Sequence, residues 1–168
     1  MARAAFVTGG SGFIGGALVR RLVADGWRVR ALARSDASAK AVAANGAEAV
    51  RGDLEDVGAM ADGARGCDVT FHCAAHLGEW GTREEFERGN VQGTKNAIEA
   101  SRRAGVQRFV HVGTEAALLD GEPLVMVDEH APLKPDSPAL YSATKAQAEA
   151  AVLAASGPDL QTVVVRPR

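Results

Sequence analysis

The chain has 168 residues, of which 46% are hydrophobic and 24% are charged, a composition typical of one globular domain with its own core. This composition excludes a disordered chain, a collagen-like fibre and a small disulfide-stabilised fold. The net charge of −2, from 19 basic and 21 acidic side chains, provides no basic excess for a nucleic-acid partner.

Two further classes of protein are not expected. No apolar run reaches the roughly 18–20 residues that span a bilayer, and the N-terminal apolar stretch is too short for a secretory signal. We therefore expect no membrane partner. The cysteines, Cys67 and Cys73, have neither zinc nor redox spacing, so we expect no metal site and a reducing cytoplasm.

In chain order, the hydrophobic pattern predicts strands and helices in alternation. They are a strand at residues 4–7, a helix at 13–25, a strand at 27–32, a helix at 37–44, a strand at 47–51, a helix at 57–63, a strand at 68–73, a helix at 83–104, a strand at 107–112, a proline-containing loop at 115–137, a helix at 139–155 and a strand at 160–165. Because the strands are apolar without strict alternation, we predict an α/β fold with a doubly wound parallel sheet and helices on both faces.

Gly9, Gly12 and Gly15 lie between the first predicted strand and the first predicted helix. This spacing permits a tight turn with positive φ and a close approach of a pyrophosphate to the backbone. The helix N-terminus adds free N–H groups and the positive end of the helix dipole. At this place in a βα series the spacing predicts a dinucleotide site. The alternative is a purely structural turn.

The segment Thr8-Gly9-Gly10-Ser11-Gly12-Phe13-Ile14-Gly15 resembles the opening fingerprint of the extended short-chain dehydrogenases/reductases, the group that includes the NAD-dependent epimerases and dehydratases. Later motifs of that family are matched in the right order. The matching segments are Gly52-Asp53-Leu54, His72-Cys73-Ala74-Ala75, Asn90-Val91-Gln92-Gly93-Thr94-Lys95-Asn96, Tyr141-Ser142-Ala143-Thr144-Lys145 and Arg166-Pro167. The resemblance implies a Rossmann-like fold and a nicotinamide cofactor. The contacts it implies with that cofactor are made by Gly9, Gly12, Phe13, Ile14, Gly15, Asp53, Leu54, Cys73, Ala74, Ala75, Thr114, Tyr141, Lys145 and Pro167.

Tyr141 and Lys145 are four residues apart, so they share one face of a predicted helix. A phenol titrates near pH ~10, and a neighbouring ammonium lowers that pKa. The tuned phenol can then exchange a proton with a carbonyl or alcohol oxygen while hydride moves to or from the cofactor. The alternative is a surface pair that meets by chance.

The resemblance implies two further catalytic residues. Thr114 fills the Ser/Thr position that hydrogen-bonds the substrate oxygen, although Gly113 stands where a second small hydroxyl residue is common. Asn90 matches a helix asparagine that supports a water-mediated proton path, and a purely structural asparagine is the alternative. We expect His72 and His111, in predicted strands, to be hydrogen-bonded scaffold residues.

Arg34 follows the second predicted strand, where an NAD site has an acidic residue for the ribose 2′-OH. Arginine instead suits a 2′-phosphate, and Ser35 can add a hydroxyl. We therefore predict NADP as the cofactor, with NAD as the alternative, because Asp36 can also reach the ribose.

The segments Gly78-Glu79-Trp80-Gly81 and 111–121 resemble the branch of 3β-hydroxysteroid dehydrogenases, dihydroflavonol reductases and 3-oxoalkanoate reductases. This implies an NAD(P)-dependent oxidoreductase acting on an apolar ketone or secondary alcohol that is steroid-, flavonol- or 3-oxoacyl-like. The alternatives are a sugar-nucleotide epimerase or dehydratase and a non-catalytic nucleotide-binding module.

The family resemblance also bears on domains and assembly. Substrate specificity in this family lies largely in a C-terminal domain, which the sequence lacks, so residues 1–168 are expected to be the dinucleotide-binding domain of a longer enzyme. A homodimer is expected through the helices near 83–104 and 139–155, with Leu140, Val152 and Leu153 as candidate anchors.

Overall fold

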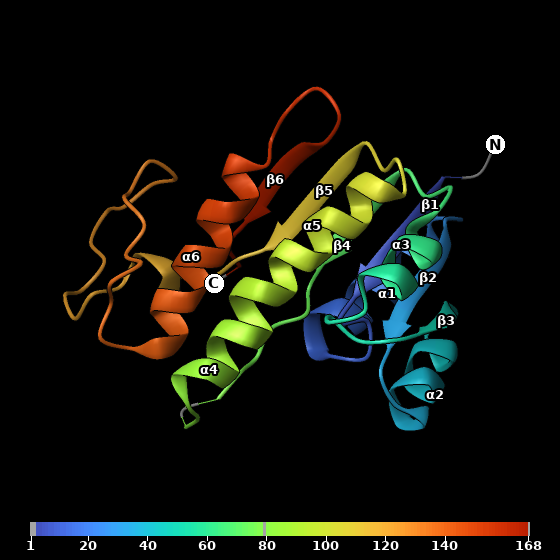
Figure 1. The fold of residues 1–168 in the computed structure, drawn as a ribbon, viewed down its shortest axis with the longest axis horizontal. Helices are drawn as coiled ribbons and strands as arrows, with labels where there is room; N and C mark the ends of the chain where they lie inside the picture. The colour runs from blue at the N-terminus through green and yellow to red at the C-terminus, as the bar shows by residue number, and fades with distance from the viewer. Residues whose placement is uncertain (1–2, 79, 168) are drawn as a thin grey trace.

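The computed structural model describes residues 3–78 and 80–167, so Glu79 of the predicted substrate segment lies outside the described part. Six parallel strands form one sheet in the order β3-β2-β1-β4-β5-β6 (Figure 1). The strands are β1 (Ala4–Thr8), β2 (Arg28–Ala33), β3 (Glu48–Arg51), β4 (Val69–His72), β5 (Arg108–Val112) and β6 (Gln161–Val165). The predicted doubly wound, Rossmann-like sheet is therefore confirmed.

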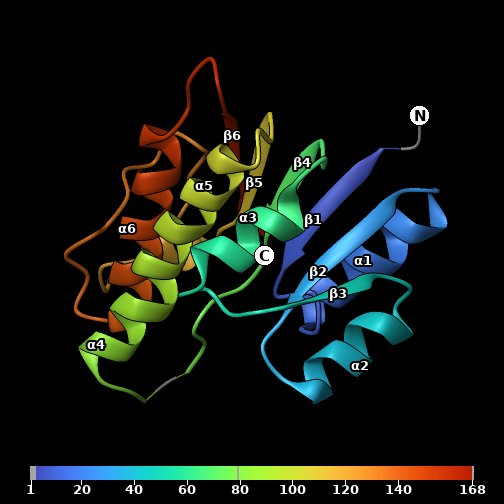
Figure 2. The same cartoon turned by 45° about the vertical axis from the view of Figure 1, so that its right-hand side comes forward.

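Helices cover both faces of the sheet (Figure 2). The helical segments are α1 (Phe13–Ala24), α2 (Asp36–Ala44), α3 (Val57–Ala64), α4 (Arg83–Phe86), the π-helical η1 (Glu87–Gln92), α5 (Gly93–Arg103), the 3-10 helical η2 (Glu115–Leu118) and α6 (Leu140–Ala154). Among the described residues, none of these helices is both long and apolar enough to cross a membrane.

Side chains of β1 alternate between two hydrophobic cores. Ala4 and Phe6 pack with residues of α3, α5 and α6, whereas Ala5 and Val7 pack with residues of α1 and α2. Val152 of α6 is fully buried in the first of these cores. The prediction that Val152 anchors a dimer is therefore wrong, because its side chain packs against the chain's own sheet.

The predicted helix at 83–104 is three segments rather than one. A π-helical turn, η1, separates α4 from α5 and turns Asn90 into the interior. A Cβ on Gly89 would lie 2.6 Å from the Cβ of His76, and one on Gly93 would lie 2.8 Å from Leu54 Cδ1. Close packing of the two glycines therefore accompanies the wider turn. The segment predicted as a loop at 115–137 likewise begins with a helical turn, η2.

The strand order reverses between β1 and β4. From β1 the chain continues to β2 and β3 on one side, and from β4 it continues to β5 and β6 on the other. In open α/β sheets the crevice at the carboxyl ends of two such strands is where ligands bind. The glycine loop follows β1 and the segment Cys73–Ala75 follows β4, so both line this crevice.

Candidate active site

The glycine loop has the geometry of a dinucleotide cradle. Gly9 has φ of +71°, and a Cβ there would lie 2.6 Å from the backbone nitrogen of Ala74. A Cβ on Gly15 would lie 2.2 Å from the carbonyl oxygen of Gly9. Gly12 is the N-cap of α1 and supplies no side-chain hydrogen bond. The N–H groups of the first turn are thus left for an anion, so these residues fit a pyrophosphate.

The other predicted cofactor contacts surround this loop. Phe13 and Ile14, on the first turn of α1, are exposed. Asp53 accepts a hydrogen bond from Glu55 N at 2.8 Å, and Leu54 O accepts one from Asn96 Nδ2 at 2.7 Å, which fixes the turn after β3 against α5.

At the other side of the crevice, Cys73 N donates to Thr8 O at 3.2 Å. Burial raises the pKa of the Cys73 thiol to about 12, so this side chain is neutral. Pro167 is exposed just after β6.

Arg34 is exposed at the end of β2. The Ser35 hydroxyl, expected beside a 2′-phosphate, caps α2 instead: it accepts from Ser38 N at 3.1 Å, and Ser38 Oγ accepts from Ser35 N at 2.9 Å. Asp36, the residue that favours NAD, forms an ion pair with Arg51 at 3.2 Å. Arg34 is therefore an exposed cation at this turn, next to the exposed ion pair of Asp36 and Arg51.

A buried polar network lies beneath the crevice. His72 Nδ1 is 2.7 Å from Thr8 Oγ1, and His72 Nε2 is 3.0 Å from Thr94 Oγ1. Thr8 Oγ1 also accepts from Ala74 N at 3.3 Å, so the network ties β1 to the segment after β4. Burial, with a smaller contribution from the Lys145 charge, lowers the pKa of His72 to about 3. His72 is the hydrogen-bonded scaffold residue that the sequence predicts.

His111 stacks on His72 with ring centroids 5.4 Å apart. Burial is the largest cause that lowers the pKa of His111 to about 2. Lys145 Nζ lies 3.4 Å from His111 Nε2 and donates to the Val112 carbonyl oxygen at 3.0 Å. If Nε2 accepts from the lysine, the ring proton lies on Nδ1, which has no partner among the described residues.

Tyr141 and Thr114 come together from α6 and the end of β5. The half-buried phenol interacts with the Thr114 hydroxyl, which lowers the pKa of Tyr141, and Thr114 Oγ1 accepts a hydrogen bond from Ala116 N at 3.2 Å. Burial is the larger effect and raises the pKa of Tyr141. The prediction that Lys145 lowers this pKa is wrong for this structure, since the ammonium is directed at β5.

Asn90 uses both ends of its amide within the protein. Its Oδ1 accepts from His76 N at 2.7 Å, and its Nδ2 donates to His76 O at 3.2 Å and to Thr144 Oγ1 at 3.1 Å. These bonds match the structural alternative, because they join the segment after β4 to α6 one residue before Lys145.

Sequence reasoning missed Glu149. This carboxylate is only 1% exposed and pairs with Arg166. It lies four residues after Lys145, and the same helical spacing that linked Tyr141 to Lys145 also indicates this neighbour.

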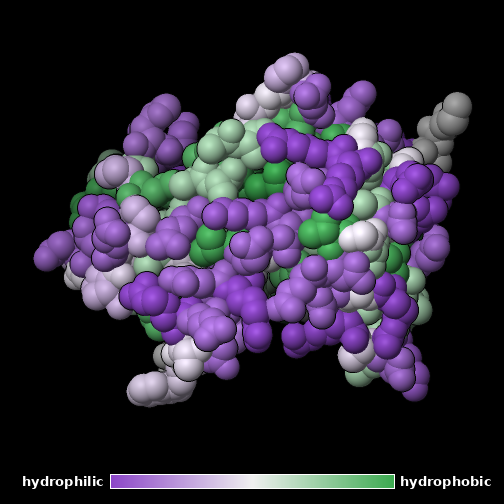
Figure 3. Space-filling view, in the orientation of Figure 1, coloured by the Kyte–Doolittle hydropathy of each residue, from purple (hydrophilic) through white to green (hydrophobic). Residues whose placement is uncertain are grey.

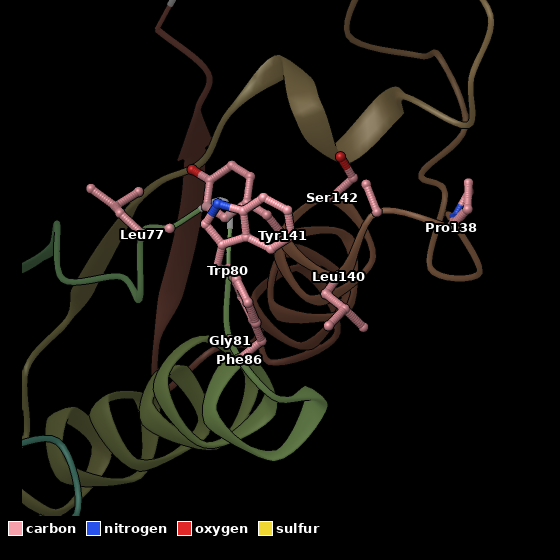
Figure 4. A pocket seen from close by; sticks show the side chains of 10 residues that line it. Leu77, Trp80, Gly81, Phe86, Pro138, Leu140, Tyr141 and Ser142 are labelled. Atoms are coloured by element: carbon pink, nitrogen blue, oxygen red, sulfur yellow. The ribbon is translucent and has the colours of Figure 1, made fainter.

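An apolar pocket adjoins Tyr141. It has a volume of about 770 Å³ and lies between the segment after β4 and the start of α6. Figure 4 shows Tyr141 among the lining side chains, with Leu77 toward one side of the view and Leu140 and Pro138 toward the other. The lining residues are Leu77, Gly78, Trp80, Gly81, Phe86, Pro138, Ala139, Leu140, Tyr141 and Ser142.

The strand order and the glycine cradle are those of a Rossmann-like fold of the short-chain dehydrogenase/reductase type. Residues 6–168 match the 3-beta hydroxysteroid dehydrogenase/isomerase family, and the chain belongs to this family. The resemblance that the motifs indicate is thereby confirmed.

Relatives of this chain include named oxidoreductases. It is 53% identical over 163 residues to 4-hydroxy-2-methyl-3-oxo-4-farnesyl-3,4-dihydroquinoline-1-oxide ketoreductase of Stigmatella aurantiaca, covering 97% of this chain and 49% of that protein. It is 40% identical over 164 residues to 2-alkyl-3-oxoalkanoate reductase of Stenotrophomonas maltophilia, covering 96% and 49%. The chain spans about half the length of the curated relatives it matches.

A similar fold is known with its cofactor. A short-chain dehydrogenase/reductase superfamily protein from Agrobacterium tumefaciens, solved with bound NAD, has a TM-score of 0.81 and 31% identity to this chain. The match covers 98% of this chain and 48% of that one.

Proposed function

We propose that this chain is the cofactor-binding domain of a longer NAD(P)-dependent oxidoreductase that interconverts an apolar ketone and a secondary alcohol. The observation that carries the proposal is the meeting of the Tyr141 and Thr114 hydroxyls beside an apolar pocket, at the sheet edge that holds the glycine cradle. The bound nicotinamide supplies the hydride acceptor or donor.

The chain's own residues supply proton transfer and orientation. Tyr141 is neutral at pH 7, because burial raises its pKa, and it can donate a proton to a substrate carbonyl oxygen. Thr114 holds the phenol and offers a second hydroxyl to the same oxygen. Lys145 is the buried cation of the site, and the resemblance assigns it to the nicotinamide ribose. The bonds of Asn90 fix α6, which carries Tyr141 and Lys145.

An apolar substrate is favoured by the pocket lining. Leu77, Trp80, Phe86 and Leu140 are among the residues that line the pocket, and none of the described lining residues is charged. Two relatives are named for the reduction of a farnesylated quinoline oxide and of a 2-alkyl-3-oxoalkanoate. We propose a ketone with a hydrophobic chain or ring system for this chain as well.

We propose NADP as the cofactor, with Arg34 as its 2′-phosphate ligand. The support is the exposed guanidinium at the end of β2, together with the ion pair that engages Asp36 with Arg51. The NAD bound to the Agrobacterium relative supports the alternative.

We also propose a homodimer through the outer faces of α4–α5 and α6. A groove of about 460 Å³ lies there, lined by Glu84, Glu87, Arg88, Val91, Gln92 and Gln147. Figure 3 shows hydrophobic colour over the upper end of α6. Leu153, near the end of this helix in sequence, is 51% exposed. Sedimentation of the wild type should give a dimer, and Leu153→Glu a monomer. A monomeric wild type contradicts this assembly.

We propose the cytoplasm as the location of the protein. The free cysteines Cys67 and Cys73 fit a reducing compartment.

Tyr141→Phe tests the reaction. In the enzyme with its cofactor, kcat for steroid or 3-oxoacyl ketones should fall by about 10²-fold or more, because the proton donor is lost while the ring remains. Thr162→Val, which removes a buried hydroxyl remote from the site, is the matched control and should keep wild-type turnover. Turnover of sugar nucleotides instead of ketones, or cofactor binding without any turnover, would contradict the proposal and favour an epimerase or a non-catalytic module.

A further inference from the structure

Among the described groups that face the buried Lys145, one is anionic at pH 7. The Lys145 side chain is 3% exposed, and desolvation lowers its pKa to about 8. From β5, His111 faces it, and from the segment after β4, the Cys73 thiol does. His72 of β4 interacts with it through charge. Both histidines and the thiol are neutral at pH 7, because their pKa values lie at about 2, 3 and 12.

The remaining groups are on α6 itself. Tyr141, one turn before Lys145, is neutral because burial raises its pKa. Glu149, one turn after Lys145, is 1% exposed and interacts with it through charge, which opposes the desolvation of the ammonium. Within residues 3–78 and 80–167, Glu149 is the carboxylate that the electrostatics of Lys145 involve.

Glu149 is held in place from the other side by Arg166, just after β6. Arg166 Nε lies 3.1 Å from both carboxylate oxygens, and Nη2 donates to Oε1 as well. A bidentate arginine fixes a carboxylate more firmly than a single bond does. The ion pair therefore holds the Glu149 carboxylate in one position, one helical turn after Lys145.

Gly113 provides the room for this pair. A Cβ at that position would lie 3.0 Å from Val164 Cγ1, 3.2 Å from Glu149 Oε2 and 3.4 Å from Arg166 Cγ. Gly113 is also where this chain departs from the hydroxyl residue that the resemblance leads one to expect. The small residue and the buried carboxylate thus occupy complementary space at the end of β5.

We propose that Glu149, clamped by Arg166, is a positioning residue that keeps the Lys145 ammonium charged and aimed along β5. Without this carboxylate the buried lysine would have neutral groups alone around it and would release its proton near neutral pH. The proposal rests on the proposed function in one respect, which is that the charged Lys145 binds the cofactor. It concerns a protonation state that can be measured without cofactor or substrate.

The test is a carbon-13 NMR titration of protein labelled at lysine Cε. The other lysines, Lys40, Lys95 and Lys134, are less buried, and Lys145→Met assigns the remaining signal. In wild type we expect the Lys145 midpoint near pH 8. In Glu149→Gln the Lys145 midpoint should fall by about 1 pH unit or more, which is the usual effect of losing a nearby opposite charge. Glu99→Gln, which removes an exposed carboxylate paired with Arg103, is the matched control and should leave the midpoint unchanged.

Two further variants separate this role from a merely structural ion pair. Glu149→Gln/Arg166→Gln removes both charges, so it leaves no unpaired arginine to destabilise the fold. We expect it to keep a low Lys145 midpoint, and a wild-type midpoint in this variant overturns the proposal. Glu149→Asp keeps the charge and withdraws it by one carbon, so an intermediate midpoint is expected. If neither Gln variant folds, an unchanged midpoint in Glu149→Asp overturns the proposal.

NADPH and NADH binding to the same proteins gives the functional readout. Affinity in Glu149→Gln should decline at a lower pH than in wild type, in step with the NMR midpoint. A wild type that binds neither nucleotide contradicts the proposed function, whereas the titration still decides the role of Glu149. The two failures are therefore distinguishable.

Discussion

The amide of Asn90 donates a hydrogen bond to Thr144 Oγ1 at 3.1 Å, which joins the π-helical turn of η1 to α6 next to Lys145. The same side chain bonds the backbone of His76 at both N and O. One buried amide therefore sets the position of α6 relative to the segment after β4. The pocket lies between these two parts of the chain.

Asn90→Ala should destabilise the protein, because it leaves the His76 N–H and carbonyl groups without their partner. We expect the free energy of unfolding to fall by about 2–4 kcal/mol, measured in urea. Gln92→Ala, also in η1, removes an exposed amide that bonds Asn96 of α5, and it should lower the free energy of unfolding by less than about 0.5 kcal/mol. Equal effects of the two variants would show that the buried bonds of Asn90 carry no special weight.

The sequence predicts the sheet well and the interior of the site poorly. Apolar runs locate the strands and helices because they are local signals. Gly26, Gly46 and Gly105, which follow α1, α2 and α5 with positive φ, are local signals for the helix ends in the same way. The π-helical turn at Asn90 has no such local signal. It depends on how Gly89 and Gly93 fit against His76 and Leu54, which are distant in the sequence.

The direction of the Lys145 ammonium also escapes sequence reasoning. Spacing on α6 places Lys145 beside Tyr141, and this spacing alone indicates a direct effect on the phenol. The structure directs the ammonium at the Val112 carbonyl, because β5 lies beneath α6 and offers an acceptor there. Burial of the phenol then decides the direction of its pKa, and burial depends on the whole fold.

Acid should destabilise the protein through His72 and His111. Their pKa values are about 3 and 2 in the folded chain, against about 6.5 in the unfolded chain. Below pH 6.5 the unfolded chain binds protons that the folded histidines do not, so the free energy of unfolding falls as pH falls. Each histidine contributes up to about 1.4 kcal/mol per pH unit.

His72→Gln should reduce this acid dependence, measured by urea unfolding at several values between pH 7 and pH 5. The variant is also expected to be less stable at pH 7, because Gln cannot reproduce both bonds to Thr8 and Thr94. His130→Gln changes an exposed histidine in the loop before α6 and should keep the wild-type dependence. An unchanged slope in His72→Gln would mean that other groups cause the acid sensitivity.

Gly113→Ala should destabilise the end of β5. The added Cβ would be 3.0 Å from Val164 Cγ1, so the strand or the Glu149 carboxylate must shift. Overpacking of this kind costs about 1–3 kcal/mol. Gly157→Ala meets no atom within 4 Å and is the control, with little change expected in the urea midpoint. A Gly113→Ala variant as stable as wild type would show that this part of the core yields easily.

Trp80→Ala should weaken binding of an apolar substrate. The indole is 88% exposed in the pocket lining, so its contacts are available to a ligand. We expect KM for a hydrophobic ketone to rise by about tenfold, equivalent to about 1.4 kcal/mol, with the affinity for the cofactor unchanged. Val125→Ala removes an exposed apolar side chain elsewhere and should leave KM as it is. A rise in KM for a small polar ketone as well would point to a general disturbance instead.

The last prediction concerns NADP and NAD. Arg34 is exposed after β2, and the nearest acidic residue in sequence, Asp36, is 3.2 Å from Arg51. A guanidinium without an adjacent free carboxylate attracts a 2′-phosphate, whereas an NAD site needs an acceptor for the ribose 2′-OH. Wild type should therefore bind NADPH more tightly than NADH, by fluorescence titration at fixed ionic strength.

Arg34→Ala should abolish most of that preference by weakening NADPH while leaving NADH nearly unchanged. Arg51→Ala is the informative comparison, because it releases Asp36 from its ion pair without removing Arg34. The freed carboxylate should then repel the 2′-phosphate and favour NADH. The preference for NADPH over NADH should therefore become smaller, although Arg34 is still present. Arg20→Ala, which removes an α1 side chain bonded to Asn45 at the end of α2, is the control for a general loss of positive charge. Tighter binding of NADH than of NADPH by wild type would overturn the assignment of NADP.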